Sequence, residues 1–181
     1  MKWSTAILSL GFIASNVYAA PTEGLALFKL KVSSDFKELD GHYLSLDSAT
    51  LGIHKGDDIS AIRVFPTSSE KTGYSELHTY PIGIVDHALG LIGYDGLLAL
   101  KDTVNPAGVK PQEGQVFEWD TFQVVNGKLT NHGEGKWLAF PSARDGWTVN
   151  WSDGTGFVTT DYMPVEISLE PAGKVGGHHS G

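Results

Sequence analysis

Short apolar segments alternate with turn residues along most of this chain. The segments are rich in Val, Ile, Leu, Phe, Tyr and Trp, and Gly, Asp, Asn and Pro stand between them. No segment carries the 3.6-residue apolar period of a long amphipathic helix. The pattern therefore predicts an all-β protein. The expected strands are 25–32, 42–46, 61–65, 76–82, 97–100, 116–125, 128–130, 137–140, 147–152 and 165–169.

Two dipeptides predict tight hairpins. Asn126-Gly127 lies between two expected strands, and both residue types tolerate the positive φ angles of a type I′ turn. Asp95-Gly96 is a second signal of the same kind. The segment 101–114 contains two prolines between expected strands, so we expect a long loop there rather than a linker between domains.

Many short strands favour a single compact domain built as a β-sandwich or a β-trefoil-like barrel. A Gly followed by a Leu-containing strand occurs at 41–44, 96–100 and 135–138, which hints at a threefold repeat with unequal spacing. The pattern alone leaves both architectures open.

The N-terminal segment predicts export from the cell. Lys2 precedes an apolar run over 6–13, and small residues end at Ala19, which is the layout of a secretory signal peptide. The run is shorter than the roughly 20 residues of a membrane span. We therefore expect a signal peptide over 1–19, an all-β domain over 20–172, and a flexible Gly/His tail over 173–181.

Composition narrows the class of secreted protein. The chain has no cysteine, which excludes disulfides, thiolate metal sites and cysteine nucleophiles, so packing of its 41% apolar residues must supply stability. Loss of Lys2 with the signal peptide moves the net charge from −8 to −9, which argues against nucleic acid and anionic membranes as partners. The polar tail is unlike a GPI signal, and its adjacent His pair is not expected to hold a functional metal. We expect no membrane attachment, no GPI anchor and no cofactor.

The segment 117–153 carries a recognisable order of features. An aromatic strand and the Asn126-Gly127 hairpin precede Gly-Lys-Trp-Leu-Ala-Phe-Pro at 135–141 and Asp-Gly-Trp-Thr-Val-Asn-Trp at 145–151. This order resembles the PhiA-like secreted cell-wall proteins of filamentous fungi. A weaker likeness around Phe28 and over 91–94 extends the resemblance across most of the chain.

The resemblance implies a small extracellular protein of the fungal wall or medium with no assigned catalytic residues. It also implies a Cys at the position of Phe140, which this chain lacks together with all other cysteines. Disulfide stapling or thiol-dependent wall attachment is therefore not expected here.

Asn150-Trp151-Ser152 is a sequon and predicts N-glycosylation of Asn150. In an extended strand, Trp147 and Trp151 share one face and Asn150 points to the other. A glycan on Asn150 would place that face in solvent and both tryptophans in the core.

The tryptophans have an alternative role as a sugar-stacking platform. Trp147 and Trp151 lie roughly 13 Å apart along a strand, and Trp137 is a third candidate. Trp residues of β proteins are more often buried in the core. The sequence leaves both interpretations open, core packing and sugar stacking.

The sequence contains no motif that predicts catalysis. Glu118, Asp120, Asp57 and Asp58 are carboxylates without the arrangement of a glycosidase pair. No Gly-x-Ser-x-Gly occurs, the seven His residues lack metal-ligand spacing, and the adjacent Asp86-His87 pair is interpreted as structural.

The sequence therefore predicts a secreted, non-catalytic protein of the fungal cell wall or extracellular matrix with a structural or surface-interaction role. Its expected partner is a wall polysaccharide or a wall protein. A small carbohydrate-binding, lectin-like module is the alternative, and a secreted hydrolase is a third.

Overall fold

The computed structural model describes residues 24–56, 59–142 and 146–175, and it confirms an all-β domain. Thirteen strands and one short 3-10 helix, η1 (Pro106–Gly108), occur in these ranges, without an α-helix. No described helix is long and apolar enough to cross a membrane. The strands are β1 (Leu25–Ser33), β2 (Ser45–Asp47), β3 (Thr50–Ile53), β4 (Arg63–Ser68), β5 (Ser75–Tyr80), β6 (His87–Tyr94), β7 (Leu97–Val104), β8 (Val116–Glu118), β9 (Phe122–Val125), β10 (Lys128–Asn131), β11 (Lys136–Ser142), β12 (Gly146–Ser152) and β13 (Met163–Val175).

Both predicted hairpin turns are confirmed. Asn126 and Gly127 have φ angles of 53° and 78°, and Val125 pairs with Lys128 across the turn. Asp95 and its following glycine also have positive φ, and they join β6 to β7. Residue types that tolerate left-handed backbone thus fix the register of both hairpins.

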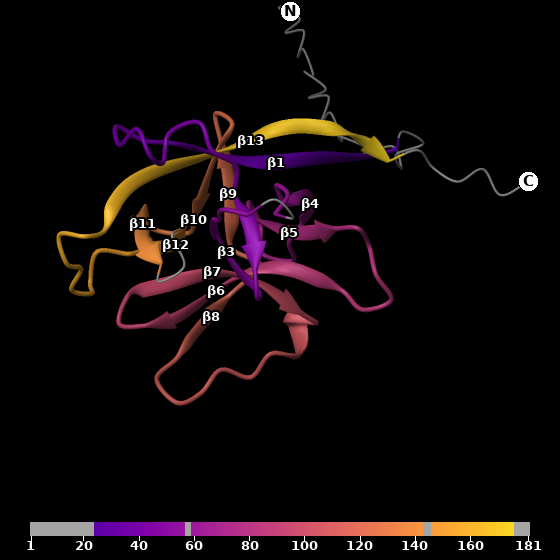
Figure 1. Cartoon of the computed structure of the whole chain (residues 1–181). Coiled ribbons are helices and arrows are strands. Elements are labelled where there is room, and N and C mark those ends of the chain that lie inside the picture. The colour runs from indigo at the N-terminus through magenta and orange to yellow at the C-terminus, as the bar shows by residue number, and fades with distance from the viewer. Residues whose placement is uncertain (1–23, 57–58, 143–145, 176–181) are drawn as a thin grey trace, which may run out of the picture.

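Six strands close into a ring through antiparallel pairing. The order is β1, β4, β5, β9, β10 and β13, and β13 returns to β1 over Leu25–Ser33. Figure 1 shows β1 and β13 side by side along one edge of the molecule. The ring is irregular, because β5 meets β9 through the single pair Ser75 and Phe122, so it is not a regular barrel.

The short β8, which pairs with β6, and three hairpins, namely β2–β3, β6–β7 and β11–β12, complete the domain. Their second strands pair with one another, since β3 meets β7, β7 meets β12 and β12 meets β3. Each third of the chain thus supplies a ring strand, a hairpin and a second ring strand. This threefold arrangement is trefoil-like and excludes a sandwich of two separate sheets.

A leucine marks the same place in each third. The first hairpin strand of each third has a buried leucine near its start. These are Leu44, directly before β2, Leu89 in β6 and Leu138 in β11. The sequence repeat at 41–44 and 135–138 therefore falls on equivalent positions. The expected middle copy at 96–100 lies instead at the turn and in the second hairpin strand, β7.

The structure differs from the expected elements at several points. It adds β3 and β6, divides the expected strand 116–125 at residues 119–121, and extends β7 into the expected loop. Residues 173–175, expected in the tail, are the end of β13. The expected signal peptide and the remainder of the tail lie outside the described residues.

Candidate functional site

The three candidate tryptophans occupy different environments. Trp137 and Trp151 are each 3% exposed and pack edge to face with ring centroids 5.1 Å apart. The Trp137 indole N–H donates to the Leu129 carbonyl oxygen at 2.7 Å. Trp147 is only partly buried, and its ring meets the exposed Phe36 edge on at 6.0 Å. Of the three, Trp147 alone has substantial surface to offer a flat ligand.

Asn150 lies within the packed part of β12. It is 8% exposed and stands opposite Leu138 of β11 on one side and Ala99 of β7 on the other. The alternation expected for this strand fails here, because residues 149–152 are all buried and both faces are covered. A glycan on Asn150 would require that amide to reach solvent from between two strands.

The carboxylates singled out in the sequence are engaged separately. Asp120 forms an ion pair with Lys71 at 2.8 Å, whereas Glu118 accepts a hydrogen bond from Asn131 and lies 3.4 Å from His132. Asp57 and Asp58 lie outside the described residues. The two acids that the structure describes, Glu118 and Asp120, therefore have separate partners.

The adjacent Asp86 and His87 do not pair with each other. Asp86 contacts Nδ1 of His78 at 2.8 Å, and Glu76 contacts the other ring nitrogen of His78 at 3.0 Å. His87 contacts Asp102 on β7 at 2.9 Å. Asp86 directly precedes β6 and His87 is its first residue, and each has its partner on another strand.

Glu118 helps to form a hollow of about 120 Å³ that we call the Glu118 hollow. It lies where β7, β8, β10 and β12 end near one another. Its polar and aromatic lining residues are Glu118, Asn131, His132, Trp151 and Asp153. Glu118 and Trp151 are both candidates from the sequence. The sequence does not predict that they line one hollow, because they come from different thirds of the chain.

The polar groups of the Glu118 hollow are held in place by other side chains. Asn131 is 1% exposed and accepts a hydrogen bond from the Thr121 hydroxyl at 2.8 Å, while its own amide donates to Glu118. The Thr155 amide and hydroxyl donate to Asp153 at 2.8 Å and 2.7 Å, and these bonds hold the pKa of Asp153 below its ordinary value. The hollow thus presents fixed acceptors beside an indole edge.

Gly96 is required for this geometry. A Cβ built at Gly96 would lie 2.1 Å from the Asp153 carboxylate, and its φ of +72° is unfavourable for other residues. The Asp95-Gly96 turn therefore serves both the hairpin and the placement of Asp153.

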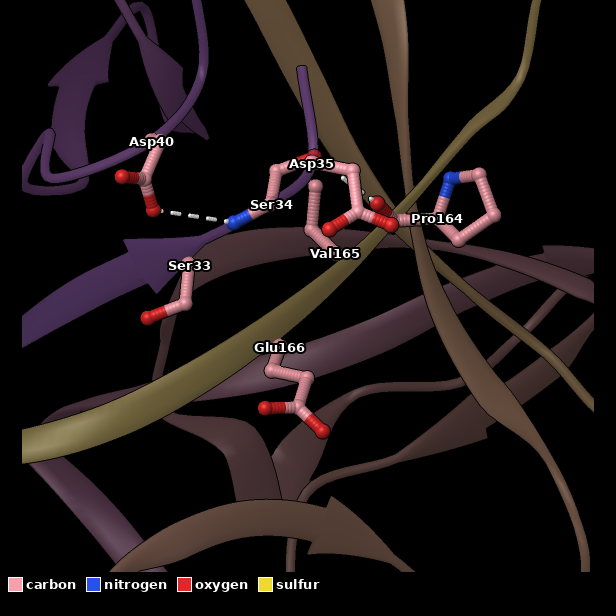
Figure 2. A pocket seen from close by; sticks show the side chains of 7 residues that line it. All are labelled: Ser33, Ser34, Asp35, Asp40, Pro164, Val165 and Glu166. Atoms are coloured by element: carbon pink, nitrogen blue, oxygen red, sulfur yellow. Dashed lines mark hydrogen bonds between the residues drawn. The ribbon is translucent and has the colours of Figure 1, made fainter. Parts of the chain in front are cut away.

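A larger hollow of about 450 Å³ lies between the end of β1 and the start of β13. Figure 2 shows its acidic residues, Asp35, Asp40 and Glu166, spread around Ser34 rather than converging. Asp40 accepts the Ser34 amide at 3.1 Å, and Glu166 pairs with Lys128 at 2.7 Å. Two of the three acids therefore already have structural partners.

No group of three or more His, Asp or Glu residues suited to a metal ion occurs within the described ranges. Fold and surface together define a trefoil-like all-β domain with shallow polar hollows. No family model, curated protein or solved structure matches the chain.

Proposed function

We propose that this chain is a secreted, non-catalytic protein of the fungal cell wall or extracellular matrix that acts by surface recognition. Its leader-like N-terminus and the PhiA-like order of features over 117–153 support the location. The observation that carries the recognition role is the Glu118 hollow, whose acceptors are fixed by hydrogen bonds from neighbouring groups.

Fixed polar groups favour the binding of a polar ligand. A ligand that meets pre-positioned acceptors loses less free energy to side-chain ordering. Asn131, buried and bonded at both ends of its amide, holds Glu118 through one of those bonds. The hollow also holds a second acid, Asp153, and glycoside hydrolysis uses two carboxylates, so the test must separate binding from release of sugar.

A pull-down on insoluble chitin, β-glucan and washed fungal walls tests the proposal. We expect the native chain to be retained on at least one material without release of soluble sugar, and a heat-denatured sample to be lost in the wash. Release of soluble sugar over time would instead indicate a hydrolase. A native chain that binds none of the three would contradict recognition of wall polysaccharide.

A lectin-like module is the second candidate, because Glu118, Asn131 and Asp153 line one hollow. Carboxylate and amide groups accept hydrogen bonds from sugar hydroxyls, and an amide also donates to them. We expect Glu118→Gln to weaken retention on the bound polysaccharide several-fold. Asp120→Asn, which alters a nearby acid paired with Lys71 outside the hollow, is the matched control and should leave retention unchanged.

A further inference from the structure

The indole N–H of Trp151 has no acceptor among the described residues. The neighbouring Trp137 donates its own N–H to the Leu129 carbonyl oxygen at 2.7 Å. Trp151 is 3% exposed, yet its nitrogen keeps some accessible surface, because Asp102 Oδ1 is the single buried side-chain N or O atom without a partner in the described ranges. A buried Trp usually finds a partner for this N–H. The N–H of Trp151 therefore points to an acceptor supplied from outside.

Glu118 offers an acceptor that a ligand can reach. Its Oε2 accepts a hydrogen bond from the Asn131 amide at 2.5 Å and lies 3.4 Å from Nδ1 of His132. Its Oε1 has no hydrogen-bond partner within the described residues, and it is not buried, since the one buried oxygen of that kind there belongs to Asp102. One carboxylate oxygen of Glu118 is thus held in place, and the other is open to a donor.

Trp151 and Glu118 both line the Glu118 hollow, but they come from strands that do not pair with each other. β7 pairs with β12, β6 pairs with β7, and β8 pairs with β6, so two strands lie between the two residues. The hollow therefore lies between a donor on one strand and an acceptor on another.

The size and the apolar lining of the Glu118 hollow limit what it can hold. Leu98, which is buried, and Val116, which is exposed, are its apolar residues. The volume is about 120 Å³, and a water molecule takes about 30 Å³ in the liquid, so the hollow has room for about four atoms of that size. It therefore fits a small group with an apolar part rather than a whole sugar ring.

We propose that the indole N–H of Trp151 opens into the Glu118 hollow, and that the hollow binds the acetamido group of an N-acetylated amino sugar in a polysaccharide. The acetamido carbonyl oxygen accepts from Trp151, and the acetamido N–H donates to Glu118. The methyl group contacts Leu98 and Val116. In a planar trans amide the C=O and N–H bonds point in opposite directions, which suits a donor and an acceptor on separate strands. This inference rests on the proposed function and names the ligand class of the same site.

The set of donors and acceptors disfavours simpler groups. An ammonium carries donors only, so it would leave the indole N–H of Trp151 unpaired. A carboxylate carries acceptors only, and it would meet the negative charges of Glu118 and Asp153. A hydroxyl can donate and accept, but it has no apolar part to contact Leu98 and Val116. Of these groups, the acetamido group alone matches the donor, the acceptor and the apolar lining together.

The test measures binding of three soluble tetrasaccharides to the secreted chain by calorimetry, and follows the indole N–H signals by NMR. The sugars share one backbone and differ in a single substituent, which is acetamido in the chitin tetramer, amine in the glucosamine tetramer and hydroxyl in cellotetraose. We expect the chitin tetramer to bind at least about tenfold more tightly than either of the others. The Trp151 signal, assigned by its absence in Trp151→Phe, should move with the chitin tetramer alone. Equal binding of the three sugars, or a Trp151 signal that does not move, would overturn the proposal.

Two pairs of variants test the proposed contacts. Trp151→Phe removes the N–H and keeps an aromatic ring, so it should reduce the tenfold preference to about twofold or less. Trp147→Phe is the matched control, because it removes an indole N–H from the same strand outside the hollow, and it should keep the preference. Equal loss in both would overturn the proposal. Thermal midpoints establish folding, and if Trp151→Phe does not fold, Glu118→Gln should reduce the preference several-fold while Asp120→Asn leaves it unchanged.

A tetraalanine peptide distinguishes a sugar from a protein partner, because its backbone amides carry the same donor and acceptor. We expect it not to bind, and binding as tight as that of the chitin tetramer would overturn the proposal and assign the hollow to a protein. Retention of the native chain on β-glucan or washed walls, with no preference for the chitin tetramer, would overturn this inference and leave the proposed function standing. Retention on no wall material and binding of no tetramer would contradict both.

Discussion

Trp137 and Trp151 stand directly opposite each other in the β11–β12 ladder and pack edge to face in the core. They therefore hold one hairpin of the trefoil-like arrangement against the ring. Both are candidates for sugar stacking from the sequence, but their burial gives them a structural role in the core. Trp151 also lines the Glu118 hollow.

Removing the Trp151 ring should cost far more stability than removing the Trp147 ring. Trp151→Ala leaves a large cavity, and we expect a loss of about 3–5 kcal/mol in the free energy of unfolding. Trp147 keeps part of its surface in solvent, so Trp147→Ala should cost about 1–2 kcal/mol. Urea denaturation followed by circular dichroism measures both, and Trp151→Phe provides a milder variant if the alanine form does not fold. Equal losses would contradict the different packing of the two rings.

Trp147→Ala also tests the stacking platform. If Trp147 and its neighbour Phe36 bind polysaccharide, the folded variant should lose retention on wall material. We expect retention to change little, because the proposed contacts lie in the Glu118 hollow. A folded Trp147→Ala variant that no longer binds would move the site to this aromatic pair.

Gly52 should not tolerate alanine. A Cβ there would lie 1.9 Å from the backbone oxygen of Trp147, because β3 and β12 pair at this residue. Backbone cannot yield cheaply, so we expect Gly52→Ala to lower the free energy of unfolding by more than about 3 kcal/mol. Gly133→Ala is the control, since its added Cβ meets open space and only the positive φ costs about 1–2 kcal/mol. A similar loss of unfolding free energy in the two variants would contradict this prediction, because it would show that β3 and β12 move apart at little cost.

Tyr43 and Glu170 should titrate as partners. The Tyr43 hydroxyl donates to Glu170, and this bond, followed by the positive charge of Lys31, holds the pKa of Glu170 below its ordinary value. The same bond raises the pKa of Tyr43, because it stabilises the protonated phenol. NMR titration of Tyr43→Phe should move the Glu170 midpoint up toward its ordinary value. An unchanged midpoint would show that the hydroxyl does not bond to Glu170 in solution.

The direction of the pH effect on stability follows from these shifts. The lowered pKa of Glu170 contributes stability that is present above its unfolded pKa and is lost as the pH falls through the folded value. The raised pKa of Tyr43 contributes stability that is present below its unfolded pKa and is lost as the pH rises through the folded value. We expect denaturation at several pH values to show a free energy of unfolding that depends less on pH in Tyr43→Phe. The decrease should appear both on the acid side, from Glu170, and on the alkaline side, from Tyr43. Asp153, bonded to Thr155 instead, should titrate unchanged in that variant.

Occupancy of the Asn150 sequon can be measured by mass. Asn150 is buried between β11 and β7, so we expect treatment with an N-glycosidase to leave the mass of the secreted chain unchanged. A loss of glycan mass would show that β12 leaves Asn150 accessible during or after folding. Asn150→Gln, expressed beside the wild type, identifies the site in that case.

The sequence by itself determined the fold class and both sharp hairpins. Apolar alternation and the Asn126-Gly127 and Asp95-Gly96 turns act locally, through side-chain period and tolerance of positive φ. β3 and β6 escaped detection because Gly52, Gly90 and Gly93 dilute their strand signal. Gly52 and Gly90 are explained only by neighbours distant in sequence, since a Cβ at Gly90 would meet the Phe117 ring at 2.5 Å, whereas Gly93 faces Leu97 within its own hairpin.

Tertiary structure alone decided the ring closure and the contents of each hollow. Asp86 and His87 are adjacent in sequence, yet their partners are His78 and Asp102, reached across strand pairs. Glu118 and Trp151 line one hollow although they come from different thirds of the chain. Such contacts depend on the order in which strands pair, which a local pattern of apolar and polar residues does not encode.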